Sequence, residues 1–161
     1  MNNPTCSEYS QFSPDIPFTM GFPKEGICNK QKILIVGVVP DTVKDNPEFI
    51  LKTDNGNEPF HVVIDKSDNV VYRWGTVDGG VTGKQGEPED GTTIDYSEPF
   101  TMTVTCDDDG WMLKVNTELA YPHFFHLFSP LNVTGFEILG DVVITFVGIG
   151  DEGISGHLCL V

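Results

Sequence analysis

The chain has 161 residues, 39% of them hydrophobic, which is enough for one domain with its own core. It is strongly acidic, because 24 Asp and Glu residues stand against 9 Lys and Arg residues and give a net charge of −15. That balance argues against binding to nucleic acid or anionic lipid, since both need a basic surface. No apolar run reaches the length of a membrane span, so we expect no membrane insertion.

Alternating apolar and polar residues predict β-strands along the chain, and no window suits a long amphipathic helix. Residues 1–15 are polar and irregular, and they predict a surface-bound arm. This start also lacks the basic segment and apolar core of a secretory signal, so we expect a cytoplasmic protein, one exported without a signal peptide, or a chain whose signal was trimmed. In the first half, strands are expected at 16–21, 32–39, 49–52, 60–65 and 70–74, with a short strand around Val81.

The clearest alternation lies between Phe100 and Asn116. Apolar residues at 100, 102 and 104 alternate with threonines, and those at 111, 113 and 115 alternate with longer or polar residues. Between them, residues 106–110 supply turn chemistry, because Asp tolerates a left-handed backbone and Gly has no Cβ. This segment predicts a β-hairpin. An aromatic run at 124–128 and two apolar stretches within 135–150, broken at Gly140, complete a core of antiparallel strands.

Several short motifs follow one another in the second half of the chain. They are FTMTV at 100–104, WMLKVN at 111–116, FFHL at 124–127, PL at 130–131 and FEILGDVVI at 136–144. This succession resembles the second half of a galectin domain, although Leu127 stands where that family usually has Arg. The resemblance implies an all-β, antiparallel β-sandwich of jelly-roll type over residues 16–150, followed by a tail at 151–161. It also implies a homodimer joined at the sheet edges near the termini.

The resemblance further implies a galactoside site on the concave face of one sheet, across three consecutive strands. A sugar presents hydroxyl groups and one apolar patch, so its site needs fixed polar groups and an aromatic ring. His61 stands at the family's His, but Val63 and Asp65 stand where the family has Asn and Arg. Exchanging Arg for Asp replaces a forked donor with an acceptor, and a mispaired polar group weakens binding. We therefore expect ordinary β-galactoside binding to be lost or strongly weakened.

The next two strands also depart from the family pattern. Trp74 takes the place of the family's Asn, or Arg73 does so if the alignment slips by one residue. The Trp-Gly-x-Glu-x-Arg motif of the third strand is absent near Val81, where Lys84 and Gln85 stand. In an alternative alignment, the Trp74-Gly75 pair replaces that motif and Asn69 moves toward the Asn position, but no Glu-x-Arg follows.

Two functions remain open at this point. The first is a glycan-binding module with altered specificity, and the second is a protein-interaction or structural member of the family that binds no sugar. Each residue also has a plainer interpretation: His61 as an ordinary strand histidine, Arg73 as a cross-strand ion pair with Asp65, and Trp74 as core. Under the first hypothesis the glycan site comprises His61, Val63, Asp65, Arg73, Trp74, Lys84, Gln85 and the Gly-rich loop at 75–91.

Other kinds of site find little support in the sequence. No nucleophile has a paired base and no phosphate-cradling Gly loop occurs, so we expect neither an enzyme nor a cofactor. Three Asp residues at 107–109 predict a turn rather than a calcium site. The four cysteines are widely spaced, which argues against zinc, and without a secretion signal free thiols are favoured for Cys106 and the others. A staple between Cys6 and Cys159 is the alternative that the galectin resemblance offers.

Overall fold

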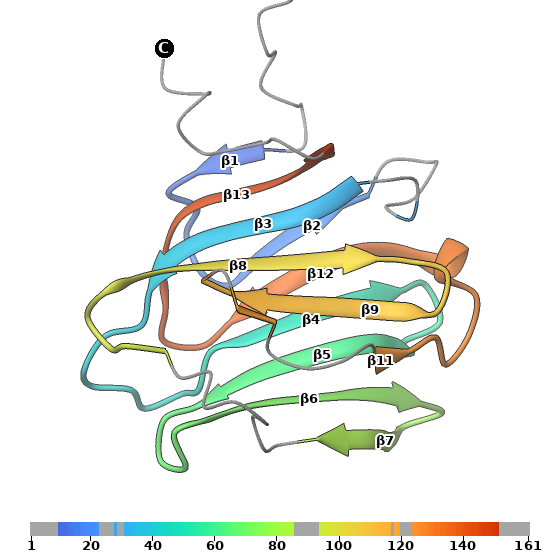
Figure 1. Cartoon of the computed structure of the whole chain (residues 1–161), viewed down its shortest axis with the longest axis horizontal. Coiled ribbons are helices and arrows are strands. Elements are labelled where there is room, and N and C mark those ends of the chain that lie inside the picture. Colours follow the sequence, from blue (N-terminus) through green and yellow to red (C-terminus); the bar gives the residue numbers. More distant parts are fainter. Residues whose placement is uncertain are drawn as a thin grey trace, which may run out of the picture.

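The computed structural model describes residues 10–22, 28, 31–85, 94–116, 118–119 and 124–151. Within these ranges the strands pair antiparallel in two stacked sheets (Figure 1). Sheet A has the order β1 (Ser10–Phe12), β13 (Val143–Asp151), β3 (Gln31–Val38), β8 (Pro99–Cys106), β9 (Gly110–Val115) and β10 (Glu118–Leu119), with β11 (Phe124–Phe125) also pairing with β9. Sheet B has the order β2 (Phe18–Gly21), β12 (Val133–Leu139), β4 (Glu48–Thr53), β5 (Glu58–Asp65), β6 (Val70–Val77) and β7 (Gly80–Gln85). The all-β sandwich predicted from the sequence is confirmed.

The strands differ from the sequence prediction mainly at their ends. Ser10–Phe12 was expected to lie in an irregular arm, yet it forms β1, because β13 supplies a pairing partner that local sequence does not reveal. The aromatic run expected at 124–128 forms a strand only at Phe124–Phe125. A three-residue 3-10 helix, η1 (Pro130–Asn132), precedes β12, and no helical segment within the described ranges could cross a membrane. Residues 1–9, 86–93 and 152–161 lie outside the described residues.

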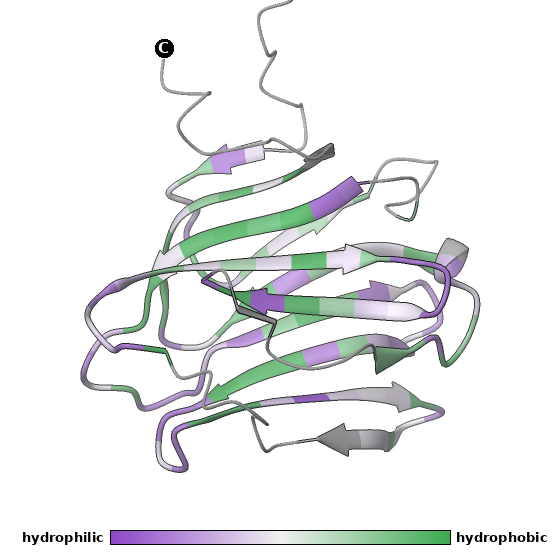
Figure 2. Cartoon of the chain, viewed as in Figure 1, coloured by the Kyte–Doolittle hydropathy of each residue, from purple (hydrophilic) through white to green (hydrophobic). Residues whose placement is uncertain are grey.

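The core lies between the two sheets and follows the period-2 alternation of the strands. On β5, Phe60, Val62 and Ile64 point inward and are at most 1% exposed. Phe60 stacks on Trp111 of the opposite sheet with ring centroids 6.4 Å apart. Figure 2 shows the same contrast along the whole fold, since β3 is hydrophobic over most of its length and the turns are hydrophilic. Each fully buried side chain of this size stabilises the fold by about 1.5–3 kcal/mol.

Arg73 also belongs to this interior, which corrects the sequence prediction. Its side chain is 0% exposed, and its guanidinium carbon lies 5.6 Å from the centroid of the Phe124 ring. Along β6 the burial alternates, so Val71, Arg73 and Gly75 face the core while Trp74 faces the opposite way. Arg73 therefore cannot contact a ligand on the face that carries Trp74.

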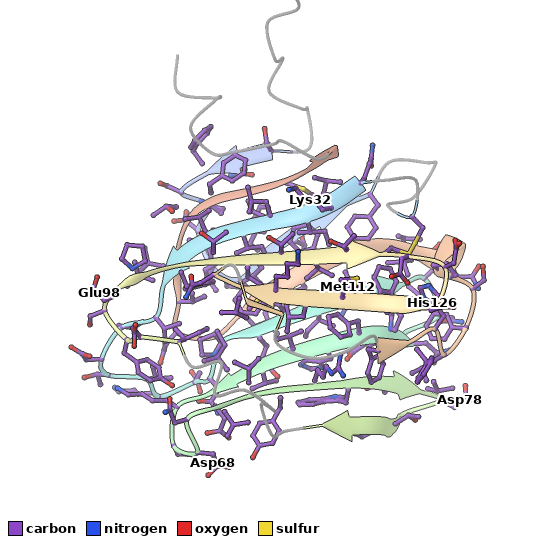
Figure 3. The ribbon with its side chains drawn as sticks, in the orientation of Figure 1. Lys32, Asp68, Asp78, Glu98, Met112 and His126 are labelled. Carbon is purple, nitrogen blue, oxygen red and sulfur yellow. A yellow bond between two sulfur atoms is a disulfide. The ribbon has the colours of Figure 1, made fainter. Side chains whose placement is uncertain are left out.

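A disulfide joins Cys28 to Cys106, and the prediction of a free thiol at Cys106 is therefore wrong. The two residues lie 78 positions apart in sequence, but the fold brings their Cα atoms to 4.9 Å, a distance that suits a disulfide. Cys28 comes from the segment between β2 and β3, whereas Cys106 ends β8 at the rim of sheet A, where the sulfur–sulfur bond appears in Figure 3. Cys6 and Cys159 lie outside the described residues.

Candidate functional site

The face of sheet B turned away from sheet A, which we term the outer face of sheet B, holds a histidine between two carboxylates. His61 Nε2 lies 3.0 Å from Glu48 Oε1, and His61 Nδ1 lies 2.9 Å from Glu58 Oε2. Glu48 comes from β4 and Glu58 from the start of β5, so two neighbouring strands supply the pair. A carboxylate oxygen accepts hydrogen bonds, so a His61 nitrogen that carries a proton donates it to a glutamate. Both ring nitrogens of His61 are thus engaged inside the protein.

Trp74 covers this histidine from β6. The ring centroids of His61 and Trp74 lie 4.4 Å apart at an interplanar angle of 35°, and the two residues are direct cross-strand partners. Trp74 is half-buried, whereas His61 is only 8% exposed. We term Glu48, Glu58, His61 and Trp74 the outer-face cluster. Because the Trp74 ring stands over the imidazole, an incoming molecule meets the indole before the histidine.

A shallow open depression of about 500 Å³ borders the outer-face cluster. Apolar and polar groups share its lining, an arrangement typical of sites for small polar molecules with one apolar face. Strands β4, β5, β6 and β12 contribute to it, together with the segment that leads into β4. The lining residues are Lys44, Asp45, Asn46, Glu48, Val63, Trp74, Leu139 and Gly140.

One wall of the depression is held in place by Asp141, in the turn between β12 and β13. Its Oδ2 accepts hydrogen bonds from the backbone N–H groups of Lys44 at 2.7 Å and Asp45 at 2.9 Å. These two donors hold the pKa of the Asp141 carboxyl below its ordinary value of 3.8, with a smaller contribution from the nearby Lys44 charge. The Asp141 N–H also donates to the Asp45 carbonyl at 2.8 Å. The segment that borders Glu48 is therefore held by hydrogen bonds to the Asp141 carboxylate and backbone.

Gly140 permits this close approach. It has a φ of +88°, and a Cβ there would collide with the backbone of Asn46. Only glycine fits a left-handed position with a neighbouring chain this near. The turn and the wall of the depression consequently depend on one another.

The residues predicted from the sequence are distributed unevenly over this region. His61, Val63 and Trp74 lie together on the outer face of sheet B, where Val63 is 7% exposed and belongs to no part of the core between the sheets. Asp65 shares this face by alternation, but its Oδ1 accepts hydrogen bonds from Ser67 Oγ at 2.7 Å and from the Asp68 N–H at 3.2 Å in the following turn.

Three further sequence-predicted positions come from β7 and from the turn between β5 and β6. Lys84 and Gln85 belong to β7, and nothing is described of their side chains. Asn69, the alternative polar residue, sits in the turn between β5 and β6 with a φ of 53°. A β7 strand around Val81 was expected and is present, with that valine 61% exposed.

Sequence reasoning missed both carboxylates of the cluster and the wall contributed by residues 44–46. Glu48 and Glu58 sit at the ends of their strands, and the register that brings them to His61 is a tertiary property: Ile50 of β4 is the direct partner of His61. One signal was available, however. A histidine in the middle of an otherwise apolar strand needs hydrogen-bond partners once it is buried, and carboxylates on neighbouring strands are suitable candidates.

A two-sheet antiparallel sandwich with a polar cluster and a half-buried indole on one outer face is an arrangement found in lectin-type β-sandwiches. Residues 17–149 match the family model described as galactoside-binding lectin, and the chain belongs to this family. The search of curated proteins found no match to this chain.

Solved galectin structures share the fold. The Caenorhabditis elegans galectin LEC-6 superposes with a TM-score of 0.76 at 16% identity, covering 89% of this chain and 97% of that one. A double variant of human galectin-16 gives 0.75 at 15% identity, with 88% and 99% covered. Sheep galectin-11 in complex with glycerol gives 0.70 at 19% identity, with 86% and 100% covered. At these identities the likeness establishes the architecture alone.

Proposed function

We propose that this chain is a glycan-binding module, rather than an enzyme, whose site is the depression on the outer face of sheet B and whose β-galactoside affinity is weak. The observation that carries the proposal is the half-buried Trp74 ring beside an open depression with polar walls. An indole offers an apolar surface on which one face of a sugar ring packs, while nearby polar groups fix its orientation. Membership of the galactoside-binding lectin family supports the same chemistry.

The expected loss of ordinary β-galactoside specificity follows from three positions. Both nitrogens of His61 are bound to carboxylates, so this residue has no ring nitrogen to offer a sugar hydroxyl. Val63 supplies no hydrogen bond, and Asp65 presents an acceptor where the family has a forked donor. Removing such contacts costs about 1–3 kcal/mol each, which reduces a weak lectin affinity below detection.

A glycan array followed by calorimetry tests the proposal. We expect binding to at least one neutral glycan at micromolar to millimolar affinity, and weaker binding to lactose than to that glycan. Trp74→Ala should lower the affinity by about five- to thirtyfold, as expected for a lost stacking contact of about 1–2 kcal/mol. Met112→Ala on the outer face of sheet A is the matched control and should leave the affinity unchanged. Tight lactose binding, or equal binding by the Trp74→Ala variant, would contradict the proposal.

The second candidate is a protein-interaction role without sugar binding. Phe125 on β11 is 74% exposed, and an aromatic ring at such exposure is a common anchor in protein interfaces. The outer edge of β1 also leaves a strand edge beside Phe12, which is 41% exposed, and a homodimer through this edge fits the resemblance. A silent glycan array together with a Phe12→Glu change in sedimentation behaviour would favour this candidate.

We further propose that the protein works in an oxidising environment outside the cytosol. The Cys28–Cys106 disulfide supports this location, because such bonds persist mainly in secreted and extracellular proteins. Peptide mapping of protein from its native source under non-reducing conditions tests the point. Recovery of these two cysteines as thiols would contradict it.

A further inference from the structure

The charged groups around the depression are mainly acceptors with negative charge. Among its described lining side chains, Asp45 and Glu48 are acidic and Lys44 is basic. The Lys44 charge is offset by Asp141, whose carboxylate binds the Lys44 backbone N–H and whose pKa is lowered in part by the Lys44 ammonium. A second lysine on this face, Lys52, lies 3.4 Å from Glu137 Oε1. Lys44 and Lys52 each have a carboxylate nearby. Among the described side chains of this face, an anionic ligand would therefore find only lysines whose charge is already offset.

Glu48 is the carboxylate best placed to act on a ligand. It lines the depression while its Oε1 is held at 3.0 Å by His61 Nε2. A carboxylate offers about four lone-pair directions, so the second oxygen retains acceptor capacity. The His61 ring is itself fixed by Glu58 and covered by Trp74, which leaves the Glu48 carboxylate little rotational freedom. A charged acceptor held rigidly beside an indole forms shorter and stronger hydrogen bonds than a neutral one.

We infer that the depression binds a neutral glycan that donates hydroxyl groups to the Glu48 carboxylate while one face of the sugar packs on Trp74, and that it excludes glycans bearing sulfate or carboxylate. This inference rests on the proposed function and specifies its ligand class. Neighbouring hydroxyl groups on a pyranose ring are donors that a carboxylate accepts in pairs. A sulfate or sialic acid brings a like charge to Glu48 and Asp45, and the net charge of −15 opposes its approach from a distance.

The geometry also gives His61 a role other than ligand contact. Because both of its nitrogens bind carboxylates, His61 sets the position of Glu48 and does not touch the sugar. The family histidine is retained, but its hydrogen bonds are directed into the protein. Recognition thereby passes to a glutamate on the neighbouring strand β4.

The test compares a neutral glycan with its acidic counterpart on matched variants. An array carrying neutral, sialylated and sulfated glycans is probed with the wild-type chain, Glu48→Gln and Glu137→Gln. Calorimetry then measures the strongest neutral glycan and the same glycan bearing one sulfate. Glu137→Gln is the matched control, because it removes a carboxylate of the same face that does not line the depression. Circular dichroism and the unfolding midpoint of each variant confirm that it is folded.

We expect the wild-type chain to bind the neutral glycan at least tenfold more tightly than the sulfated one at low salt. Glu48→Gln should weaken neutral binding about tenfold and reduce the discrimination to less than threefold, whereas Glu137→Gln should change neither value. Raising the ionic strength should narrow the wild-type discrimination as well, because salt screens the repulsion.

Three outcomes would overturn the inference. Acidic glycans that bind as tightly as neutral ones contradict the ligand class. Neutral binding that depends on Trp74 but is unaffected by Glu48→Gln removes Glu48 from recognition, although the proposed glycan-binding function survives. No binding to any glycan by the folded wild-type chain overturns the proposed function and this inference with it.

Discussion

The outer faces of the two sheets follow the same alternation in sequence but differ in how their residues are covered. On sheet A, the threonines of β8 at 101, 103 and 105 alternate with core residues and remain half-exposed. On sheet B, both outer-face residues in the middle of β5, His61 and Val63, are buried at 8% and 7% exposed. Figure 3 shows the first situation, with Met112 on the face of sheet A turned to the viewer.

The difference comes from the neighbours of each strand. Thr103 is paired with Lys114, whose long side chain is exposed, so the threonine keeps contact with water. His61 lies between β4 and β6, which cover it with Glu48 and Trp74. A buried residue on the outer face of a sheet therefore marks a place where side chains from neighbouring strands cover that face. A buried polar residue there must carry its hydrogen-bond partners with it.

The strongest test of this difference between the two outer faces is to introduce an aspartate on each of them. Val63→Asp should lower the free energy of unfolding by about 3 kcal/mol or more, because it puts an unpaired carboxylate at a buried position beside Glu48. Thr103→Asp should cost less than about 1 kcal/mol, since it is half-exposed and faces Lys114. Urea unfolding of the two variants measures both values. Similar losses would show that the faces are covered alike.

The disulfide should matter for the stability of the sandwich and not for the outer face of sheet B. Replacing Cys28 and Cys106 together with Ser should lower the free energy of unfolding by about 2–4 kcal/mol, because a loop of 78 residues is released in the unfolded chain. Thermal unfolding with and without a dithiol measures this. The double variant is its own control, as it should not respond to the dithiol. A change in the glycan affinity of the folded double variant would contradict the expectation that the disulfide does not affect the outer face of sheet B.

Removing the imidazole should leave the two carboxylates of the outer-face cluster without their shared hydrogen-bond partner. His61→Leu should destabilise the fold by about 1–3 kcal/mol, because Glu48 and Glu58 lose their shared partner while part of each stays buried. Adding Glu48→Gln and Glu58→Gln should restore part of the loss. A double-mutant cycle by chemical denaturation measures the coupling. Additive changes would mean that the three side chains act independently.

The smallest effect concerns Asp141 and appears in acid. Its carboxyl pKa is lowered in the folded state, so its stabilising contribution is complete above the ordinary value of 3.8 and is lost as the pH falls through the lower folded value. Wild-type stability should therefore decline more steeply below that pH than the stability of Asp141→Asn. Denaturation midpoints measured between about pH 5 and pH 2 test this, and parallel profiles would argue against it.

The sequence is sufficient to predict most of the strands, but the contacts of the candidate site depend on pairing between strands. Alternation located β5, β8 and β9 closely, because each strand packs one face on the core, and a β-branched run located β3. Alternation along β6 could also have predicted that Arg73 faces the core, because Arg73 lies two residues after Val71 and so on the same face of the strand. The charge of Arg73 favoured a surface position, since arginine is rarely buried, and this general tendency was wrong here.

The partners of His61 and the disulfide were harder to foresee for a different reason. Glu48 and Cys28 reach their partners only through strand register and the stacking of the sheets. Neither is set by local spacing, because their partners lie 13 and 78 positions away. The family resemblance directed attention to the face that carries His61, Val63 and Trp74, whereas Glu48 and Glu58, which contact His61, come from the ends of strands.

The Cys28–Cys106 bond encloses every strand from β3 to β8 in one covalent ring. Glu48, Glu58, His61 and Trp74 all come from this enclosed stretch of chain. A protease that cuts once anywhere between the two cysteines cannot release a fragment: the pieces stay tethered, migrate together on a non-reducing gel and separate only after reduction. The outer-face cluster therefore stays attached to the rest of the protein after a single cleavage in this stretch, for as long as the disulfide stays oxidised.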